Sequence, residues 1–534
     1  MTKYIFITGG VVSSLGKGIV AASIGNLLEY RGFNVDFLKF DPYINYDPGT
    51  MNPYQHGEVF VTIDGAETDL DLGHYERFTS KITTKYNNYT AGKIYSNVIR
   101  KERNGEYEGA TVQIIPHITN EIKSHIEQFK DKTDVVIVEI GGTVGDIESL
   151  PFLEAIRQFK RDVGRKNVIF IHLALIPFLN TADEFKTKPI QHSVIKLREL
   201  GIQPDILICR SNVELPDKIK KKIELFCDVD LEFIISNYDI ESIYEVPIQL
   251  QNKKLDTIII KKLGLKLKKL ENQEWVDLIE KQKKINNSST YVTIGIIGKY
   301  LCKDAYMSLN EAIVHAGIEL NVNIKLDYID SSENTDKTIN ICKTLDAIIV
   351  PGGFGKRGIE AKLKAIKIAR LNKIPFLGIC LGMQLAIIEF CRNKIYLPSV
   401  DSEEFNQSCE NTVIEIIEKD MERPELGGTL RVGSSYYCKL KDTYLAKRYY
   451  KESLIEERHR HRFEFNIDYR IILEDNGMII TGESLNSKSV DIVELKDHPF
   501  FMGVQFHPEF NSKFTKPHPL FIGLIKAAIT YKEK

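Results

Sequence analysis

The stretch that decides the fold opens the chain: Tyr4-Ile-Phe-Ile-Thr8, then Gly9-Gly-Val-Val-Ser-Ser-Leu-Gly-Lys-Gly18, then Ile19-Val-Ala-Ala-Ser-Ile-Gly-Asn-Leu-Leu-Glu-Tyr30. This pattern predicts a buried strand, a glycine-rich turn and a helix. Glycines let backbone N–H groups face an anion, the helix N-terminus adds positive potential, and Lys17 supplies a mobile charge. We therefore expect a phosphate-binding loop. The alternative is a glycine-rich strand–helix turn with a solvated lysine.

The loop departs from the usual phosphate-loop pattern in two places. Five residues rather than four separate Gly10 from Gly16, and Gly18 stands where Ser or Thr normally ligates magnesium. Ser13 and Ser14 are the expected substitutes for the missing hydroxyl.

Length and composition limit the classes of protein to consider. At 534 residues the chain is too long for one hydrophobic core, so two or three domains are expected. A charged fraction of 27% and a net charge of −2 give no sign of a nucleic-acid or anionic-membrane surface. We find no signal peptide and no apolar run of membrane-spanning length. The eight cysteines form no C-x-x-C pair, which favours a cytoplasmic protein with reduced thiols.

Strands and helices alternate along the first half of the sequence, which predicts one doubly wound α/β domain. Acidic and basic side chains lie at or near the ends of several of these strands. Lys39 ends a strand, where open sheets place ligands, although a solvated edge lysine fits equally well. Asp69 and Asp71 would share one side of an extended segment and suit magnesium; a surface acidic loop is the alternative. Glu139 ends the buried run Val135–Val138, as carboxylates do in phosphate-loop enzymes that hold magnesium.

Two basic stretches follow. Lys186-Thr-Lys-Pro-Ile-Gln-His192 suits capture of a polyanion, although such loops are often merely solvated. Residues 261–290 are rich in lysine, and Trp275, Leu278 and Ile279 within them predict a short amphipathic helix that docks on one domain. Asn286–Ser289 then marks a domain boundary.

The second half carries a cysteine in a strand-to-helix elbow. Gly378-Ile-Cys380-Leu-Gly382 has the small-x-nucleophile-x-small layout, whose glycines permit the strained turn that exposes a nucleophile. The following helix N-terminus helps to offer N–H groups to an oxyanion. His507 and Glu509 would share one side of an extended segment, so the carboxylate can orient the imidazole toward Cys380. Cys380 alone could be a buried cysteine in a strand–helix turn, and His507 alone could be structural, but together with Glu509 they favour a catalytic triad.

The segment Glu456–Glu464 alternates basic side chains. His459 and His461 could bind a metal ion but lack an obvious third ligand. A wall that binds a carboxylate through Arg462 is the preferred interpretation.

These motifs resemble known families. The second half is similar to class I glutamine amidotransferases, which use a Cys–His–Glu glutaminase. Five segments resemble CTP synthase, close to its bacterial form and over nearly the whole chain: Gly9–Gly18, Asp41–Phe60, Ala66–Phe78, Glu139–Phe159 and Lys186–Ser193. The resemblance implies two doubly wound α/β domains, a phosphate-loop-like synthetase (amidoligase) domain at 1–265 and a class I glutaminase domain at 291–534, joined by a linker at 266–290.

The resemblance also implies a reaction. ATP phosphorylates O4 of UTP, glutamine is hydrolysed through a Cys380 thioester, and ammonia passes through the interior and displaces the phosphate to give CTP. Free ammonia can replace glutamine. The implied small molecules are Mg²⁺, ATP as co-substrate, GTP as activator and CTP as inhibitor, without a redox cofactor. The implied assembly is a homotetramer, a dimer of dimers, that filaments could extend; no nucleic acid or membrane is involved.

Site residues are carried over by similarity at matching positions. The catalytic residues are Cys380, His507 and Glu509, and the magnesium ligands are Asp71 and Glu139. ATP binding is implied for Ser14, Leu15, Gly16, Lys17, Gly18, Ile19, Asp71, Tyr238, Asp239 and Ile240. Binding of UTP or CTP is implied for Ser13, Asp146, Ile147, Glu148, Lys186, Thr187, Lys188, Pro189, Ile190, Gln191 and Lys222. Glutamine binding is implied for Gly353, Leu381, Gly382, Met383, Gln384, Glu404 and Arg462.

The sequence departs from the family at three places, and two rival classes of protein share some of its motifs. Ile190 stands where the family has threonine, which removes a hydroxyl from the expected UTP site. The segments after Glu404 and around Cys302–Asp304 are shorter than in the family. They belong to loops in which the resemblance implies that GTP activation is tuned. A glutamine-dependent ligase of the cobyrinate type would lack the loop Asp41–Phe60. A nucleotide-switch protein of the partitioning type would have no use for the glutaminase residues.

Overall fold

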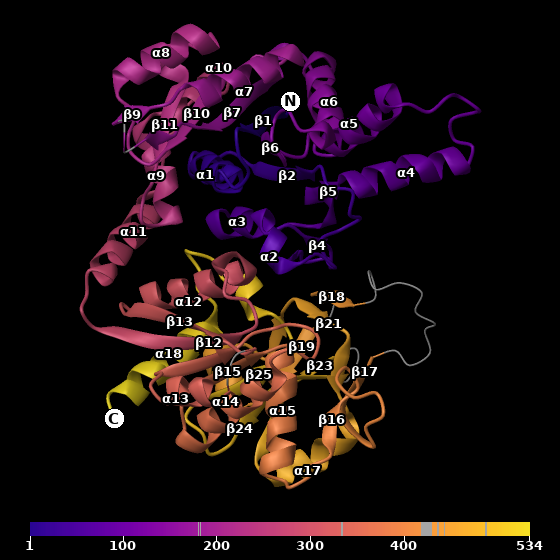
Figure 1. The fold of residues 1–534 in the computed structure, drawn as a ribbon, viewed down its shortest axis with the longest axis vertical. Coiled ribbons are helices and arrows are strands. Elements are labelled where there is room, and N and C mark those ends of the chain that lie inside the picture. Colours follow the sequence, from indigo (N-terminus) through magenta and orange to yellow (C-terminus); the bar gives the residue numbers. More distant parts are fainter. Residues whose placement is uncertain are drawn as a thin grey trace. The chain divides into compact units, whose positions relative to one another are not determined.

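The computed structural model describes residues 1–179, 181, 183–332, 335–417, 430–434, 437–442, 444–485 and 489–534. The chain forms two compact units, each described here by itself (Figure 1). The first comprises Met1–Pro48 and Asp71–Ile279, and the second Gly49–Leu70 and Glu280–Lys534. The expected domain limits at 265 and 291 therefore differ from the compact units. Residues 49–70 join the second unit, and the boundary falls inside a helix.

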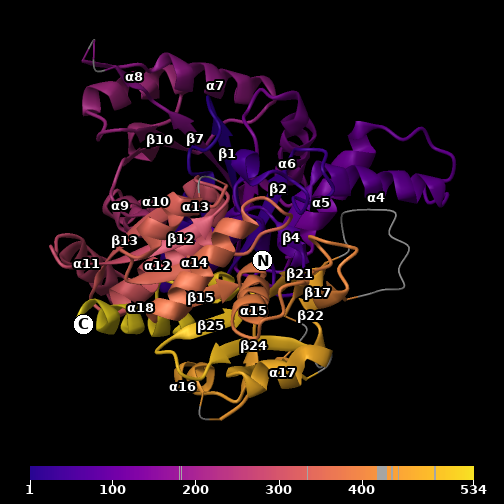
Figure 2. The same cartoon turned by 60° about the horizontal axis from the view of Figure 1, so that its bottom comes forward.

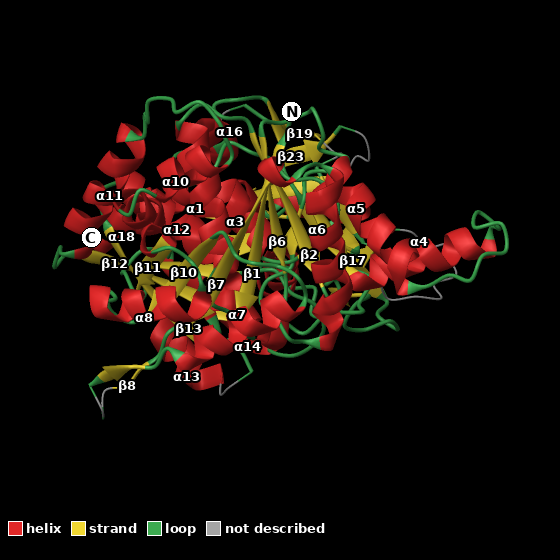
Figure 3. Cartoon of the chain, turned by 90° about the horizontal axis from the view of Figure 1, so that it is seen from above, coloured by secondary structure: helices red, strands yellow, loops and turns green. Residues whose placement is uncertain are grey.

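The first unit is built on a seven-stranded sheet in the order β11-β10-β7-β1-β6-β2-β5, with every pair parallel (Figure 3). Its strands are almost wholly buried, as expected when helices cover both faces of a parallel sheet. This confirms the predicted doubly wound domain. The strands are β1 (Lys3–Gly10), β2 (Val35–Asp41), β5 (Asn88–Thr90), β6 (Val135–Ile140), β7 (Val168–Leu175), β10 (Ile206–Ser211) and β11 (Ile234–Tyr238).

Side-chain alternation along β2 shows how the helices are divided between the faces. Leu38 and Phe40 belong to the apolar cluster formed with α4 (Ala91–Arg103), α5 (Thr119–Glu127), α6 (Leu150–Asp162) and α7 (Lys188–Glu199). Phe37 points the other way and stacks on Tyr75, with ring centroids 4.5 Å apart. Helix α1 (Lys17–Tyr30) covers the face to which Phe37 points, and three helices pack against α1: α3 (Asp71–Phe78), α9 (Val246–Asn252) and α10 (Leu255–Lys262). Helix α8 (Asp217–Cys227) packs beside α7.

The helix predicted around the only tryptophan is α11 (Gln273–Asn286). Trp275 is buried, and its indole N–H donates to the carbonyl of Tyr244 at 2.8 Å. The N-terminal part of this helix therefore docks on the first unit, as expected.

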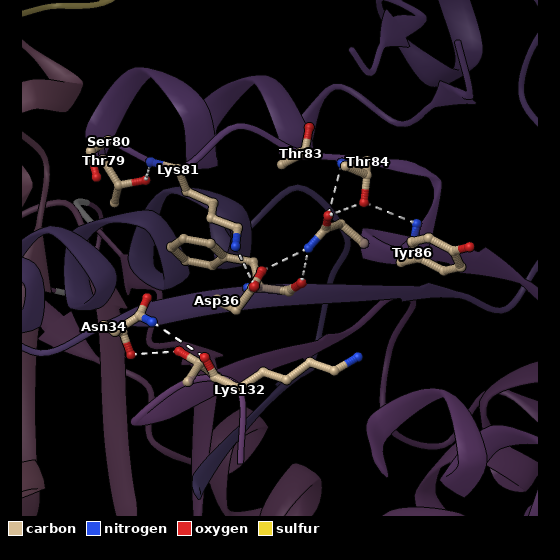
Figure 4. A network of polar contacts seen from close by, with 12 residues as sticks. Asn34, Asp36, Thr79, Ser80, Lys81, Thr83, Thr84, Tyr86 and Lys132 are labelled. Atoms are coloured by element: carbon tan, nitrogen blue, oxygen red, sulfur yellow. Dashed lines mark hydrogen bonds and ion pairs between the residues drawn. The ribbon is translucent and has the colours of Figure 1, made fainter. Parts of the chain in front are cut away.

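A polar network surrounds the N-terminal end of β2 in the first sheet (Figure 4). Asp36 pairs with Lys81 and accepts a hydrogen bond from the Asn87 amide at 2.9 Å. Thr84 caps the short turn Lys85–Asn87. A hollow of about 450 Å³ lies beside these residues. The bonds hold residues 79–87 against the sheet edge opposite the one that binds ligands in such folds.

The second unit is built on a nine-stranded sheet in the order β13-β12-β14-β15-β25-β24-β23-β19-β20 (Figure 2). Pairs from β13 to β25 are parallel, whereas those from β25 to β20 are antiparallel. The expected doubly wound arrangement thus holds for one half only, because strands joined by short connections return antiparallel. The strands are β12 (Tyr291–Gly298), β13 (Asn323–Asp330), β14 (Ala347–Val350), β15 (Phe376–Ile379), β19 (Tyr437–Leu440), β20 (Leu454–Glu456), β23 (Met478–Ser484), β24 (Val490–Leu495) and β25 (Phe501–Val504).

Two apolar clusters line the faces of this sheet. One contains residues of α13 (Thr335–Cys342), α14 (Ile359–Asn372), α15 (Leu381–Asn393) and α17 (Arg470–Asp475), and the other residues of α12 (Met307–Glu319), α16 (Leu445–Tyr450) and α18 (Pro519–Lys532). Smaller sheets pair β16 (Val400–Ser402) with β17 (Asn411–Ile416) and β22 (Phe463–Phe465), β18 (Arg431–Gly433) with β21 (His459–His461), and β3 (Phe60–Val61) with β4 (Glu67–Thr68). Another pairs β8 (Phe178–Leu179) with β9 (Glu184–Phe185), and α2 (Pro53–His56) is a single turn. Within the described residues, no helix is long and apolar enough to cross a bilayer.

Candidate active sites

The cysteine elbow of the second unit forms as predicted. Cys380 lies between β15 and α15 with φ at +53°, and its N–H donates to the carbonyl of Val504 at 2.7 Å. A Cβ on Gly378 would lie 2.6 Å from the backbone of Gly382, and one on Gly382 would lie 2.1 Å from the carbonyl oxygen of Val350. Both glycines are therefore required by close backbone approach, and the left-handed conformation at Cys380 holds the turn open.

His507 and Glu509 form the pair expected beside this cysteine. The His507 Nδ1 atom lies 2.7 Å from Glu509 Oε1. Burial alone would lower the pKa of His507, but the charge of Glu509 and hydrogen bonding with Cys380 and Glu509 raise it to about 10. The segment was expected to be extended, but His507 caps a 3₁₀ turn, Pro508–Asn511. Proline favours the first position of such a turn. The turn brings Glu509 back to the imidazole.

The imidazole of His507 and the side chain of Cys380 both lie next to Gly352. A Cβ at this position would lie 2.7 Å from His507 Cε1 and 3.6 Å from Cys380 Cβ. The thiol lies 3.6 Å from the carbonyl oxygen of Arg460, and the Gln505 amide nitrogen lies 3.7 Å from the sulfur. The triad lines a cavity of about 260 Å³, bordered further by Gly49, Thr50, Lys299, Tyr300, Gly353, Phe354 and Arg460 among others. The Arg460 and Gln505 contacts were not foreseen.

The expected glutamine-binding residues divide into two groups. Gly353 borders the cavity, and Glu404 accepts a hydrogen bond from the Gly355 N–H at 2.6 Å. Burial raises the pKa of Glu404, although the Gly355 N–H and Lys299 oppose that rise. The side chains of Leu381 and Met383 lie in the apolar core. Any contact they make with a substrate comes from the backbone N–H groups of the first turn of α15, which Gly382 shares.

The remaining glutamine candidates lie on neighbouring strands. The amide of Gln384 donates to the carbonyl of Phe463 at 2.9 Å and to Gln505 at 3.2 Å, so it ties α15 to β22. Arg462 is partly buried, directly before β22. His459 and His461 contact each other, Nδ1 to Nε2 at 3.0 Å, and burial keeps the pKa of both well below the usual value. No group of three or more side chains able to hold a metal ion occurs among the described residues.

The glycine-rich loop of the first unit has the backbone of an anion-binding turn. Val11, Ser14 and Gly16 have φ values of +80°, +55° and +85°. The Lys17 side chain lies across Gly9, where a Cβ would be 2.8 Å from Nζ, and donates to the carbonyl of Gly142 at 2.6 Å. Burial lowers the pKa of Lys17, while nearby Glu139 opposes that shift. A negatively charged ligand would stabilise this buried ammonium.

Asp71 occupies the place that sequence patterns reserve for a hydroxyl. A Cβ on Gly18 would lie 1.9 Å from the Asp71 Oδ1 atom. The carboxylate of Asp71 fills the space that a side chain at position 18 would need, and Ser13 and Ser14 stay the predicted substitutes for the missing hydroxyl. Ser13 and Ser14 are both exposed. The expectation of an extended segment through Asp69 is wrong, because Asp71 begins α3.

A buried cluster of charges surrounds Lys39, which is not a solvated edge lysine. Its ammonium pairs with Asp71, with Glu139 at 3.1 Å and with Asp41 at 3.6 Å. Burial raises the pKa of Glu139 and Asp41. Burial would also raise the pKa of Asp71, but Lys39 brings it below the ordinary value.

Tyr75 completes this cluster. It donates to Glu139 at 2.6 Å. Sequence reasoning missed Tyr75 and Asp41, although Asp71 and Tyr75 stand four residues apart on one helix face.

The expected pyrimidine-nucleotide residues lie in two loops and one helix. Asp146, Ile147 and Glu148 are exposed after β6, and the Asp146 carboxylate accepts from the Thr143 N–H at 3.1 Å. Thr187 precedes α7, and the side chain of Gln191 donates back to it at 3.0 Å. Pro189 occupies the first turn of that helix, and Lys186 pairs with Glu184. Lys186 is partly exposed, whereas Lys188 on α7 and Lys222 on α8 are exposed.

Ile190 differs from its expected role. Its side chain is fully buried in the apolar cluster with Ile176, Phe185 and Val194. Only its backbone can face a ligand, so the replacement of threonine by isoleucine changes the core beneath α7 rather than the surface of a nucleotide site.

The expected adenine residues end the sheet. Tyr238 is the last residue of β11, and its carbonyl accepts from Gln249 at 3.1 Å. Asp239 pairs with Arg210, and Ile240 is partly exposed. These residues and the glycine-rich loop follow the carboxyl ends of parallel strands of one sheet, where such folds bind ligands.

Comparisons with known proteins identify two family regions in this chain. Residues 3–265 match the family model for the CTP synthase N-terminus, and residues 301–527 match glutamine amidotransferase class-I. The CTP synthase of Caldanaerobacter subterraneus subsp. tengcongensis is 54% identical over 536 residues, 100% of this chain and 99% of the relative. That of Geobacillus kaustophilus is 54% identical, covering 99% of this chain and 100% of the relative. The solved glutaminase domain of Trypanosoma brucei CTPS with bound acivicin is 35% identical, covering 45% of this chain and 94% of that chain with a TM-score of 0.42.

The two sites and their folds define a glutamine amidotransferase joined to a nucleotide-binding α/β unit. An enzyme of this class is a ligase that takes its amino nitrogen from glutamine. Identity above 50% over the full length shows the family: the chain belongs to the CTP synthases.

Proposed function

We propose that this chain aminates UTP to CTP by dividing the reaction between its two units. The first transfers the γ-phosphoryl group of ATP to O4 of UTP. The second hydrolyses glutamine to glutamate and ammonia, which displaces the phosphate. One observation carries the proposal: a Cys380–His507–Glu509 site and a glycine-rich loop backed by Asp71 and Glu139 occur in one chain of this family.

The glutaminase step follows from the elbow geometry. His507 takes the proton of the Cys380 thiol and holds it as an imidazolium before the sulfur attacks the glutamine amide carbon, and Glu509 orients and stabilises that imidazolium. Backbone N–H groups in the first turn of α15 stabilise the oxyanion. His507 returns the proton to the departing ammonia, and water then hydrolyses the thioester. The raised pKa of His507 suits this proton-holding role.

The synthetase site fits a nucleotide bound with Mg²⁺. Asp71 and Glu139 would hold the ion, because carboxylate oxygens and phosphate oxygens are the ligands it prefers. Bound there, the ion would neutralise charge that develops on the phosphate oxygens. Lys17 would leave the Gly142 carbonyl for a phosphate, and Lys39 balances the three carboxylates around it.

The finer assignments belong to the same proposal and rest on family membership. ATP is held by Ser14–Ile19 and Tyr238–Ile240, and UTP or inhibitory CTP by Ser13, Asp146–Glu148, Lys186–Gln191 and Lys222. Glutamine contacts Gly353, the first turn of α15, Glu404 and Arg462. GTP activates, the enzyme assembles as a homotetramer, and it works in the cytoplasm, a setting that its eight free cysteines suit.

The test is CTP formation from UTP, ATP and Mg²⁺ with glutamine or with ammonia, for wild type and Cys380→Ala. The proposal predicts that wild type uses both nitrogen sources and that the variant uses ammonia alone. Glutamine hydrolysis without CTP formation from either source would show that UTP is the wrong acceptor.

A further inference from the structure

Residues 49–70 lie between two segments of the first unit in sequence but are built into the second unit. Two arginines beside and within β21 hold this segment. Arg458 donates to the carbonyl of Val61 at 3.0 Å, and Arg460 donates to the Glu67 carboxylate at 2.7 Å and to the carbonyl of Gly49 at 3.0 Å. The side chains of Arg460 and Glu67 are only 14% and 8% exposed, so their ion pair is mostly buried.

The same two arginines contact the catalytic pair through their main chain. The carbonyl of Arg458 accepts the His507 N–H at 2.8 Å, and the carbonyl of Arg460 lies 3.6 Å from the Cys380 sulfur. Each arginine therefore touches residues 49–70 with its guanidinium and a catalytic residue with its carbonyl. Displacing either side chain moves a group that contacts the nucleophile or its base.

Stacked rings make a second connection to the imidazole. The Phe60 and Phe510 ring centroids lie 5.1 Å apart, and the Phe510 ring stacks on His507 at 5.2 Å with an interplanar angle of 18°. Phe60 and Phe510 are both buried. Residues 49–70 thus reach His507 through packing as well as through Arg458.

We propose that Arg458 and Arg460 are positioning residues for the glutaminase, and that residues 49–70, chiefly through Glu67, set their placement. The inference rests on the proposed function, because it assigns these residues to the hydrolysis of glutamine. The segment follows the loop after Asp41 and precedes Asp71, both of which lie in the charge cluster of the phosphate site.

A purely structural ion pair is the competing explanation, and a matched control separates the two. Arg370 and Glu389 form a similarly buried pair in the same unit, with side chains 11% and 0% exposed and bonds of 2.7 and 2.8 Å. Within the described part of the chain neither residue forms a hydrogen bond or ion pair with Cys380 or His507, so loss of this pair reports the cost of breaking a buried ion pair alone.

The experiment compares full-length Glu67→Gln, Arg460→Lys and Glu389→Gln with wild type. Three quantities are measured: alkylation of Cys380 by iodoacetamide across pH, kcat and KM for glutamine, and ammonia-dependent CTP formation. We expect Glu67→Gln and Arg460→Lys to lower kcat with glutamine by about tenfold or more, because small displacements of reacting groups are costly. We also expect them to shift the pH profile of alkylation while ammonia-dependent synthesis persists.

Glu389→Gln should lower the unfolding temperature without shifting the alkylation profile. The inference is overturned if Glu67→Gln and Arg460→Lys leave alkylation and kcat unchanged, or if Glu389→Gln shifts alkylation equally. Because alkylation does not require CTP synthesis, it reports on positioning even if UTP proves to be the wrong acceptor.

Discussion

At the scale of single residues, Gly18 shows how one missing side chain shapes the phosphate site. The common loop places a hydroxyl residue there, but in this protein the space belongs to the carboxylate of Asp71. The hydroxyl and the carboxylate exclude one another, so the loop departs from the common pattern for a steric reason.

The Gly18→Ser variant tests this account. Its Cβ would displace Asp71, so we expect CTP formation with glutamine and with ammonia to fall by about 100-fold, the effect typical of a ~1 Å misplacement. Glutamine hydrolysis should persist. Ser13→Ala serves as the comparison and should lose less activity than Gly18→Ser, because it removes a hydroxyl without displacing Asp71. A severe loss in Ser13→Ala with normal activity in Gly18→Ser would assign the role to the hydroxyl instead.

Gly352 is the corresponding residue in the glutaminase site. The Gly352→Ala variant places a Cβ 2.7 Å from His507 Cε1, so we expect glutamine-dependent synthesis to fall by about 100-fold while ammonia-dependent synthesis remains. Gly353→Ala is the comparison and should lose less activity than Gly352→Ala, because its Cβ would meet no protein atom closer than 3.6 Å. Steady-state kinetics with both nitrogen sources measure the effect. Equal losses in the two variants would contradict the steric explanation.

The protonation of His507 has a consequence for stability. Its pKa rises from 6.5 to about 10 in the folded protein, so the protonated imidazole stabilises the fold below pH 6.5. That contribution is lost as the pH rises through the folded value. In Glu509→Gln the pKa should fall, so its deficit in unfolding temperature relative to wild type should widen from pH 10 down to pH 6.5. NMR titration of the imidazole gives the direct check, and an unchanged midpoint in Glu509→Gln would refute the assignment.

At the scale of elements, the strength of the sequence signal decides which expectations were correct. β7 (Val168–Leu175) has the predicted bounds, because a short, mostly apolar run that opens with β-branched and aromatic residues is typical of a buried strand. The elbow at Cys380 was predicted correctly because its two glycines are required locally, where the backbone approaches too closely for a Cβ atom. By contrast, the turn that begins at Pro508 was expected to be extended, and the side chain of Ile190 was expected at the surface of a nucleotide site but lies in the core. Both depend on tertiary packing that a local pattern does not encode.

Helix α11 offers a test at this scale. Trp275 is buried against Phe78 and Tyr244 and donates to a carbonyl, so Trp275→Ala should destabilise the first unit by about 3–5 kcal/mol. Urea unfolding followed by circular dichroism measures the change. Glu274→Ala, at an exposed position of the same helix, should alter stability by less than ~0.5 kcal/mol. Similar small effects for both variants would show that the helix does not dock through its tryptophan.

At the scale of the whole molecule, chain order and compact units do not coincide. Residues 49–70 match the model of the synthetase family region yet pack within the glutaminase unit. No local pattern in this segment reveals that arrangement, since its contacts to Arg458 and Arg460 span about 400 positions. The antiparallel half of the second sheet was likewise beyond prediction from strand patterns alone.

The central claim is that both units serve one reaction, and nitrogen transfer tests it most directly. Glutamine labelled with ¹⁵N in its side-chain amide is supplied with UTP, ATP and Mg²⁺ in the presence of unlabelled ammonium. We predict that the label appears in the amino group of CTP, and that one ADP forms for each CTP. Labelled ammonium and glutamate without labelled CTP would contradict the account, because the two sites would then act independently.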